Sequence, residues 1–243
     1  MIFVEPDNNN LASASFSVEY LFTRYIRSEK PVLMLWQAGK TVMLGNNQVI
    51  DAEVDIEYAE KSGILIVRRS SGGGAIYTDL GTVLYTIIEP LKKEAKIHRE
   101  DVAANIIDAL TEMGVPAKRE GRNDILVEGG KVSGFAQYTS GTHICTHGSL
   151  LYDTDLDELT RVLIPNVEKL RPKGIASIRS RVTNIKPYID EAYPVSLFIK
   201  KLKSILLNGK EYSVYKFSDD ERTKLQRVNN DMYGNPYWNT KKL

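Results

Sequence analysis

The stretch ILIVRRSSGGGAIYTDLGTVLYTII, residues 64–88, decides the fold class of this chain. Its first run, Ile64 to Arg69, is rich in β-branched residues and is typical of a buried strand. Two serines and three glycines follow, and the next apolar run, over 83–88, again has the character of a strand. A Walker A loop needs a Gly-Lys-Ser/Thr ending, and a Rossmann fingerprint needs a helix after its glycines. The stretch fits neither pattern, because its glycine loop joins strand to strand.

The rest of the chain mixes amphipathic helices with hairpin-like strands. The spacing of apolar residues predicts helices over 11–27, 53–62, 99–113, 155–163 and 194–207. Further strands are predicted over 32–37, 41–44, 125–127, 131–137 and 143–152. Ala38-Gly39 is the predicted turn between the first two, and Gly129-Gly130 is a hairpin signal. The regular alternation of a doubly wound parallel sheet is missing. We therefore expect an α+β fold, with a mixed, mainly antiparallel sheet covered by helices.

The charge balance, the lack of long apolar runs and the cysteine content exclude several classes of protein. The 243 residues include 32 Lys+Arg and 31 Asp+Glu, and a formal net charge of +1 argues against a bulk nucleic-acid binder. No apolar run approaches the roughly 20 residues that a membrane helix requires, and residues 1–10 lack the pattern of a secretory signal. Cys145 is the single cysteine, which excludes an internal disulfide framework. These features predict a cytoplasmic enzyme or binding module.

The glycine loop after residue 69 is a candidate anion site. Consecutive glycines let the backbone approach a ligand closely, and successive N–H groups can form a nest for phosphate or carboxylate. Arg68 and Arg69 add charge, and an arginine fork suits bidentate binding of such anions. The alternative is a tight turn with solvated arginines. The paired arginines favour the anion site.

Lys131 opens a strand of small and apolar residues and marks a second candidate site. Gly134 in the middle of this strand suggests the close approach of a ligand or another backbone. A lysine facing a pocket there would place positive charge near a phosphate or a developing oxyanion. Asn123 and Asp124 offer oxygen atoms that suit Mg²⁺ together with phosphates. On the residues alone, an exposed hairpin lysine beside an ordinary Asn-Asp turn is the better interpretation.

His143 and His147 lie on one face of the predicted strand over 143–152. A metal pair is conceivable at that spacing, but the sequence shows no third ligand. Hydrogen bonding or packing is the favoured role for both.

Taken in order, four motifs resemble the lipoate–protein ligase family. They are RRSSGGGAIYTDLG (68–81), GRNDILVEGGKVSGFAQ (121–137), HGSLLYDTDL (147–156) and KGIASIRSRVTNI (173–185). GNNQ, at residues 45–48, resembles an earlier Gly-x-x-Gln turn of the family. The resemblance runs from about residue 11 to 190. It implies a catalytic domain related to those of biotin protein ligases and class II tRNA synthetases.

The resemblance also implies a two-step acyl transfer. Lipoate and ATP form lipoyl-AMP and pyrophosphate, with Mg²⁺ as the implied metal. A lysine of an acceptor domain then takes the lipoyl group, and AMP leaves. The implied acceptors are lipoyl domains of 2-oxoacid dehydrogenase acyltransferase subunits and the glycine-cleavage H protein. Because such domains tend to be acidic, the basic stretch 169–181 is a candidate docking patch, with a solvated basic face as the alternative.

Site residues are carried over by position within these motifs. Lys131 is the implied catalytic residue, and Asp124 is the implied magnesium ligand. The implied contacts to ATP and lipoyl-AMP are Arg69, Ser71, Gly72, Gly73, Gly74, Ala75, Ile76, Tyr77, Asn123 and Lys131. The implied substrate pocket contains His147, Gly148 and Ser149, and residues 179–181 fall in a later loop of the family.

The chain departs from the family pattern near its end. DMYGNPYWN, at 231–239, only faintly echoes the expected tryptophan-rich motif, and Thr82 stands where the family usually has Asn. We expect a catalytic domain at 1–208 and a tail at 209–243, without the accessory domain that follows in many relatives. A separate accessory chain, or a role in transfer alone, therefore remains open.

Two other functions are compatible with the motifs. An octanoyl or lipoyl transferase of the same superfamily would need a reactive thiolate. Cys145 is the available thiol, but it follows Lys131, whereas the nucleophile precedes the lysine in the cysteine-using relatives. We therefore interpret Cys145 as a packed residue. The other alternative is a non-catalytic binder that keeps the lipoate pocket.

Overall fold

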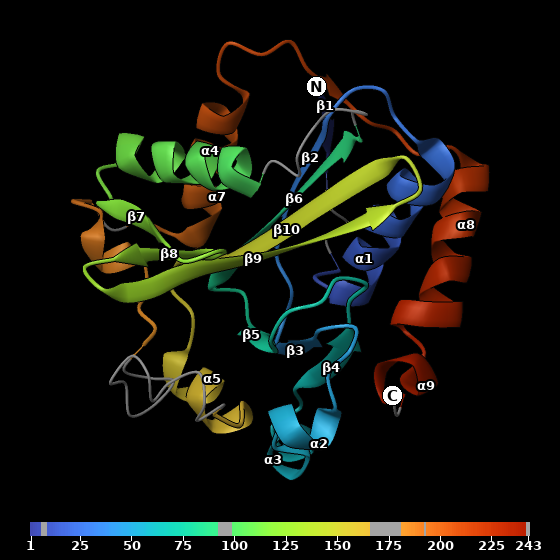
Figure 1. Cartoon of the computed structure of the whole chain (residues 1–243), viewed down its shortest axis with the longest axis horizontal. Coiled ribbons are helices and arrows are strands. Elements are labelled where there is room, and N and C mark those ends of the chain that lie inside the picture. The colour runs from blue at the N-terminus through green and yellow to red at the C-terminus, as the bar shows by residue number, and fades with distance from the viewer. Residues whose placement is uncertain (6–8, 92–98, 166–180, 192, 242–243) are drawn as a thin grey trace.

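An eight-stranded mixed sheet and a smaller three-stranded sheet organise the chain (Figure 1). The computed structural model describes residues 1–5, 9–91, 99–165, 181–191 and 193–241. In spatial order the large sheet contains β11 (Ser213–Val214), β1 (Ile2–Val4), β2 (Val32–Trp36), β6 (Thr82–Pro90), β10 (His143–Leu151), β9 (Gly130–Ser140), β8 (Asp124–Val127) and β7 (Ala117–Glu120). The small sheet contains β4 (Leu65–Arg68), β3 (Thr41–Leu44) and β5 (Ile76–Thr78).

Strand pairing in the large sheet is antiparallel from β2 to β7, and only β1 makes parallel pairs, with β2 and β11. In the small sheet, β3 pairs in parallel with β4 and antiparallel with β5. The predicted α+β fold with a mainly antiparallel sheet is confirmed.

Helices cover both faces of the large sheet. They are α1 (Ala12–Leu21), α2 (Ile50–Glu53), α3 (Ile56–Lys61), α4 (Arg99–Glu112), α5 (Leu156–Val162), α7 (Val195–Leu207), α8 (Asp219–Val228) and α9 (Pro236–Asn239), with shorter helical turns at Phe22–Ile26, Lys186–Tyr188 and Asn229–Tyr233. In β2, Leu33 and Leu35 pack into the cluster that contains α4 and α7, whereas Met34 and Trp36 pack into the cluster with α1 and α8. Figure 1 shows α4 and α7 on the opposite side of the sheet from α1 and α8.

Several helices begin or end at residues that favour helix ends. Asp155 caps α5 by accepting hydrogen bonds from two backbone N–H groups of the first turn. Ser218 caps α8 in a complete capping box with Glu221. Gly63 and Gly114 follow α3 and α4 with φ of +64° and +84°, the left-handed conformation expected after a helix. Among the described residues, no helix combines the length and the apolar character that crossing a membrane would require.

The predicted hairpin of residues 32–37 with 41–44 is wrong in its pairing. Both strands exist, but β2 pairs with β1 and β6, whereas β3 pairs with β4 and β5 in the other sheet. Every residue of both strands is buried, so neither has the alternation that would show which face meets which partner. The short connection therefore carries the chain from one sheet to the other. Three of the strands that sequence analysis missed, β1, β7 and β11, lie at or near the edges of the large sheet.

Residues 209–241 build onto the same sheet and its helical cover. Strand β11 pairs with β1, and Val228 of α8 belongs to the cluster that contains Phe16 of α1. Asn239 of α9 accepts a hydrogen bond from the backbone N–H of Arg68 at 2.8 Å. The C-terminal segment is thereby brought next to the strand that leads into the glycine loop.

Candidate functional site

The glycine loop, residues 70–75, joins β4 to β5 and packs against the turn at 45–48. A Cβ on Gly45 would lie 2.3 Å from the carbonyl oxygen of Gly73, so only glycine fits there. Gly73 has φ +98°, a conformation that residues with a side chain rarely adopt. The GNNQ turn and the glycine loop therefore form one tightly packed unit.

Arg69 lies inside this loop and holds its carbonyl groups. Its Nη2 donates to Gly72 O and Gly74 O, both at 2.8 Å, and its Nε donates to Ser71 Oγ at 2.9 Å. Burial lowers the pKa of Arg69 to about 10, which still leaves the guanidinium charged at neutral pH. Arg69 thus fixes the loop and gives it a buried positive charge.

Arg68 has an architectural role rather than the anion-binding role that its charge suggested. Its Nη1 donates to Gly45 O at 2.9 Å and to Gln48 O at 2.7 Å. Trp238 donates its indole N–H to Arg68 O at 3.0 Å, and Asn239 bonds the Arg68 backbone from the other side. The side chain is fully buried, and its Nε also donates to Asn239 O at 3.3 Å, so Arg68 ties the 45–48 turn to the C-terminal helix.

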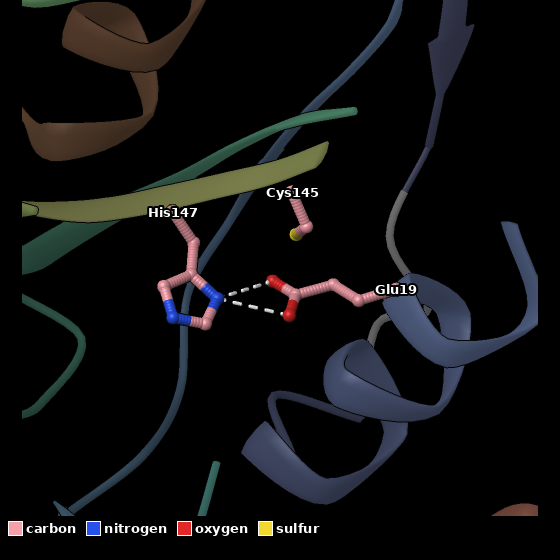
Figure 2. A group of neighbouring side chains, drawn as sticks. All are labelled: Glu19, Cys145 and His147. Carbon is pink, nitrogen blue, oxygen red and sulfur yellow. Dashed lines mark hydrogen bonds and ion pairs between the residues drawn. The ribbon is translucent and has the colours of Figure 1, made fainter. Parts of the chain in front are cut away.

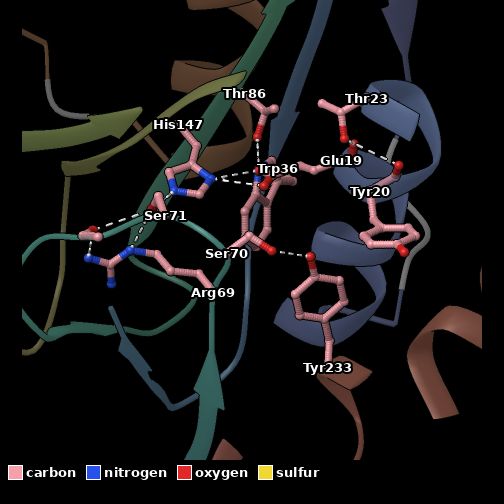
Figure 3. Close-up of polar contacts among 11 residues, drawn as sticks. Glu19, Tyr20, Thr23, Trp36, Arg69, Ser70, Ser71, Thr86, His147 and Tyr233 are labelled. Carbon is pink, nitrogen blue, oxygen red and sulfur yellow. Dashed lines mark hydrogen bonds and ion pairs between the residues drawn. The ribbon is translucent and has the colours of Figure 1, made fainter. Parts of the chain in front are cut away.

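A buried chain of hydrogen bonds connects the glycine loop to α1 (Figure 3). Ser71 Oγ lies 2.6 Å from His147 Nε2, and His147 Nδ1 lies 2.9 and 3.0 Å from the two carboxylate oxygens of Glu19. Thr86 donates to Glu19 at 2.7 Å, and Trp36 Nε1 donates to Thr86 at 3.0 Å. A carboxylate can only accept, so Nδ1 carries a proton, and in the neutral imidazole Nε2 accepts from the serine hydroxyl.

This arrangement resembles a serine–histidine–carboxylate relay, but its serine is not placed to attack a substrate. Ser71 is fully buried, and it lines neither of the two cavities described below. Its hydroxyl also accepts from Arg69 Nε. The relay therefore fixes the start of the glycine loop.

Cys145 lies next to this chain of hydrogen bonds, on the same strand as His147 (Figure 2). Its side chain is fully buried. Burial, reinforced by the charge of Glu19, raises the pKa of the Cys145 thiol well above its usual range. A buried, protonated thiol is a poor nucleophile, which argues against the cysteine-dependent transferase.

A β-bulge positions Lys131 on the face that carries the site. Leu126 pairs with Lys131 and Ile125 with Ser133, so β9 contains one extra residue between them. The extra residue puts Lys131 on the same face as Gly134, three residues later. A Cβ on Gly134 would lie 2.9 Å from Lys131 Nζ, so the group that approaches this glycine is the lysine side chain and not the ligand or backbone that the sequence suggested.

Asp124 holds the end of the Lys131 side chain. Its carboxylate forms an ion pair with Lys131 Nζ at 2.8 Å and a second ion pair with Arg181. The Lys131 side chain is one quarter exposed. The backbone is held as well, because Lys131 N donates to Arg181 O at 2.7 Å and Thr183 N donates to Lys131 O at 3.0 Å. Lys131 is therefore an oriented, partly accessible cation, not a solvated hairpin lysine.

Two cavities meet at Lys131 and the glycine loop. The larger one, of about 420 Å³, is lined by Glu53, Gly73, Gly74, Ala75, Ile76, Tyr77, Asn123, Asp124, Lys131, Ser133, Gly134, Ser149, Leu151, Leu159, Leu163, Ile164, Arg181 and Val182. The narrower one, of about 110 Å³, is lined by Phe16, Trp36, Met43, Arg69, Gly73, Gly74, Ala75, Ile76, Leu84, Asn123, Lys131, Gly134, Phe135, Ala136, His147 and Gly148. The shared lining comes from residues 73–76, Asn123, Lys131 and Gly134.

Most residues implied by the sequence motifs line one of these cavities. The exceptions are Ser71 and Gly72, which line neither. Asn123 donates to Phe135 O at 2.9 Å and thereby joins the end of β7–β8 to β9. Gly148 lines the narrow cavity with its backbone only. A Cβ on it would point away from the site and lie 2.4 Å from the Tyr85 ring, in the core under α4. Arg179 and Ser180 lie outside the described residues.

His143 stands apart from the site. Its Nε2 lies 3.0 Å from Ser28 O, which agrees with the hydrogen-bonding role predicted for it.

Sequence analysis missed Glu19 and Trp36. Glu19 sits in a predicted amphipathic helix, where an acidic residue is normally assigned to the solvent face. Trp36 lies in a continuously buried strand that shows no alternation. Neither position carries a local signal of a site, and only the packing of α1 over β2, β6 and β10 reveals them.

The chain is similar in sequence and in fold to several known proteins. The family model described as the lipoyl protein ligase A/B catalytic domain matches residues 12–207. The lipoate-protein ligase LplJ of Bacillus subtilis is 31% identical over 242 residues, which cover 98% of this chain and 73% of that protein. A chain from the structural study of the bi-partite lipoate protein ligase and E2 lipoyl domain of Thermoplasma acidophilum superposes with a TM-score of 0.82 at 25% identity, covering 100% of this chain and 96% of that chain. A lipoate-protein ligase A bound with ATP shares the fold, with a TM-score of 0.82 at 23% identity, covering 100% of this chain and 98% of that chain.

Proposed function

Because this chain belongs to the lipoyl protein ligase A/B catalytic domain family, we propose that it is an ATP-dependent lipoate–protein ligase. It activates lipoate to lipoyl-AMP and transfers the lipoyl group to a lysine of an acceptor domain. The observation that carries this proposal is the junction of two unlike cavities at Lys131.

The narrow cavity suits the acyl chain of lipoate. Its walls include Phe16, Trp36, Met43 and Leu84, and an apolar chain gains about 0.8 kcal/mol for each CH₂ that it buries. The larger cavity combines the backbone of residues 73–76 with Asn123 and polar side chains, which suits a nucleotide. The carboxylate of lipoate and a phosphate of ATP would then meet at the wall that the two cavities share.

Lys131 can then serve both half-reactions. In the first, a carboxylate oxygen of lipoate attacks the α-phosphorus of ATP, and pyrophosphate leaves. In the second, the acceptor amine attacks the lipoyl carbonyl, the C–O bond to AMP breaks, and AMP leaves with that oxygen. Negative charge builds on oxygen atoms in both steps, and a fixed cation with backbone donors stabilises it without a protein nucleophile.

Asp124 does not fit the magnesium role that the family motif implies. Its carboxylate is engaged by Lys131 and Arg181, so a metal ion there would compete with two cations. Mg²⁺ is usually held by one or two carboxylates together with substrate phosphates. We propose that Asp124 orients Lys131, and that any Mg²⁺ needed for the reaction arrives with ATP.

The acceptor is inferred from the family to which the chain belongs. A Thermoplasma ligase chain with this fold was studied together with an E2 lipoyl domain. We propose a lipoyl domain of a 2-oxoacid dehydrogenase acyltransferase subunit, or the glycine-cleavage H protein, as the acceptor for this chain. The candidate docking patch at 169–181 lies, except for Arg181, outside the described residues. A cytoplasmic location stays a prediction from the sequence.

Two assays separate the half-reactions. Pyrophosphate release from ATP and lipoate measures activation, and mass spectrometry of a lipoyl domain supplied with synthetic lipoyl-AMP measures transfer. Activity in both supports the complete ligase. Transfer without activation identifies a chain that needs an accessory partner, and the absence of both contradicts the proposal.

A further inference from the structure

Glu19, Cys145 and His147 form a buried group of three side chains whose donor atoms converge (Figure 2). Glu19 comes from α1, and Cys145 and His147 are alternate residues of β10 that share one face of the sheet. A carboxylate oxygen, the thiol sulfur and an imidazole nitrogen all lie within 4.8 Å of one another. We propose that this group binds a divalent transition-metal ion of the Zn²⁺ type.

The donor set matches this class of ion. Sulfur and imidazole ligands favour zinc-like ions, whereas Mg²⁺ and Ca²⁺ prefer oxygen ligands throughout. Three protein ligands leave a fourth position open, as in zinc sites that take water or an exogenous ligand. The ion would lie behind the wall of the narrow cavity, because His147 forms part of that wall whereas Glu19 and Cys145 line neither cavity.

The geometry needs only a small adjustment. His147 Nδ1 and Glu19 Oε2 lie 2.9 Å apart. Two ligand atoms about 2.1 Å from a tetrahedral zinc ion stand about 3.4 Å apart, so this pair would open by about 0.5 Å. The sulfur would come to about 3.6 Å from each of the other two donors, a distance within reach of a rotation of the thiol.

The outer contacts that orient metal ligands are already present. Ser71 contacts His147 through the opposite ring nitrogen, at 2.6 Å, and Thr86 donates to Glu19 at 2.7 Å. Partners of this kind fix the orientation of ligating imidazoles and carboxylates, and their loss typically costs about 10- to 100-fold in metal affinity. The sequence could not show this site, because its third ligand lies on a distant helix.

Charge and protons balance on binding. The Cys145 thiol releases its proton to solvent, so one thiolate and one carboxylate neutralise the dication in the buried site. The imidazole proton moves from Nδ1 to Nε2, where it is donated to Ser71 Oγ. The serine hydroxyl then turns toward Gly72 O, which lies 3.4 Å away. No buried charge is left without a partner.

Cobalt(II) titration of the full-length, metal-free protein tests the proposal. Thiolate-to-cobalt charge transfer gives near-ultraviolet absorption, and the chain has one cysteine, so the band can arise only at Cys145. We expect a saturable band at one Co²⁺ per chain that Zn²⁺ bleaches by displacement. Cys145→Ala should abolish the band, and His147→Ala should weaken binding at least about 100-fold.

Two further variants distinguish a built site from adventitious thiol binding. Thr86→Val should weaken Co²⁺ binding about 10- to 100-fold through Glu19, although Thr86 touches no metal. The matched control His143→Gln alters another buried histidine of β10 and should leave the titration unchanged. Circular dichroism confirms that each variant is folded before it is titrated.

The proposal is overturned if excess Co²⁺ produces no charge-transfer band. It is also overturned if folded His147→Ala and Thr86→Val bind Co²⁺ as the wild type does. Because this readout needs neither ATP nor an acceptor, it is independent of the ligase assays. For the ligase function proposed above, Zn²⁺ should inhibit lipoyl-AMP formation by the wild type by fixing His147 in the wall of the narrow cavity, and Cys145→Ser should be insensitive to it.

Discussion

Replacing Gly45 with alanine should displace the glycine loop and slow the activation step. The new Cβ would lie 2.3 Å from Gly73 O, whereas ordinary contacts begin at 3.4 Å. Gly73 must therefore retreat by about 1 Å, and it lines both cavities where they meet. A misplacement of about 1 Å at a reacting centre can cost about 100-fold in rate. We expect a loss of that size in pyrophosphate release from ATP and lipoate.

Stability has to be separated from this effect. Overpacking costs about 1–3 kcal/mol, so Gly45→Ala should also lower the melting temperature. Gly81→Ala is a matched control for that loss, because its Cβ would lie 2.0 Å from Asp153 O in a turn outside both cavities. Gly39→Ala is the benign control, since its nearest neighbour atom would be 4.0 Å away.

The assay compares the three variants at a temperature where each is fully folded. Gly45→Ala and Gly81→Ala should both melt earlier than the wild type, but only Gly45→Ala should lose activation. If Gly45→Ala keeps a rate within a few fold of the wild type, the loop does not need its observed position. If Gly81→Ala loses as much activation rate as Gly45→Ala, the loss is due to reduced stability and not to the loop position.

We also predict the effects of three substitutions, at Lys131, Cys145 and Ser218. Lys131→Ala should reduce lipoyl-AMP formation about 100- to 1000-fold, as measured by pyrophosphate release. The control Lys200→Ala changes an exposed position of α7 and should have the activity of the wild type. A near-normal rate for Lys131→Ala would refute the role of this lysine. Cys145→Ser should retain ATP-dependent lipoylation of an acceptor domain, and loss of acyl transfer would revive the cysteine mechanism. Ser218→Ala should lower the free energy of unfolding by about 1 kcal/mol, because the α8 cap is lost. Denaturant unfolding measures this loss, and Ser204→Ala, at an exposed helical position, is the control.

Local signals predicted local structure well, and pairing between distant segments poorly. The helices predicted over 99–113 and 155–163 depend on residues within each segment, and both appear, as α4 and α5. The separation of β2 from β3 depends on which strands lie beside each of them. Both strands are buried throughout, so the sequence contains no alternation from which their partners could be predicted.

Glu19 shows the same limit within the site. Seven of the ten residues of α1 are buried, because the large sheet covers one side of the helix and α8, from the far end of the chain, packs on it as well. Ser13, Ser15, Ser17 and Glu19 all lie in the interior, and Glu19 contacts His147 and Thr86 on the sheet side. Polar residues on a predicted helix are normally assigned to its solvent face. Here they lie in the interior, and no sequence window of helical length contains α1 together with β6, β10 or α8.

The two arginines before the glycine loop make contacts that differ from those their charge suggested. Their charge suggested direct contacts with an anion, yet the guanidinium groups donate to carbonyl groups of the loop and of the 45–48 turn. A glycine-rich loop in the interior has carbonyls that no sheet satisfies, and an arginine fork can bond several of them at once. Arg69 stays charged while doing so. The positive field at the loop therefore persists, and we expect hydrogen bonds to an anionic ligand to come from backbone N–H groups and from Lys131, which is why we predict that the reaction is sensitive to the loop position and to the lysine.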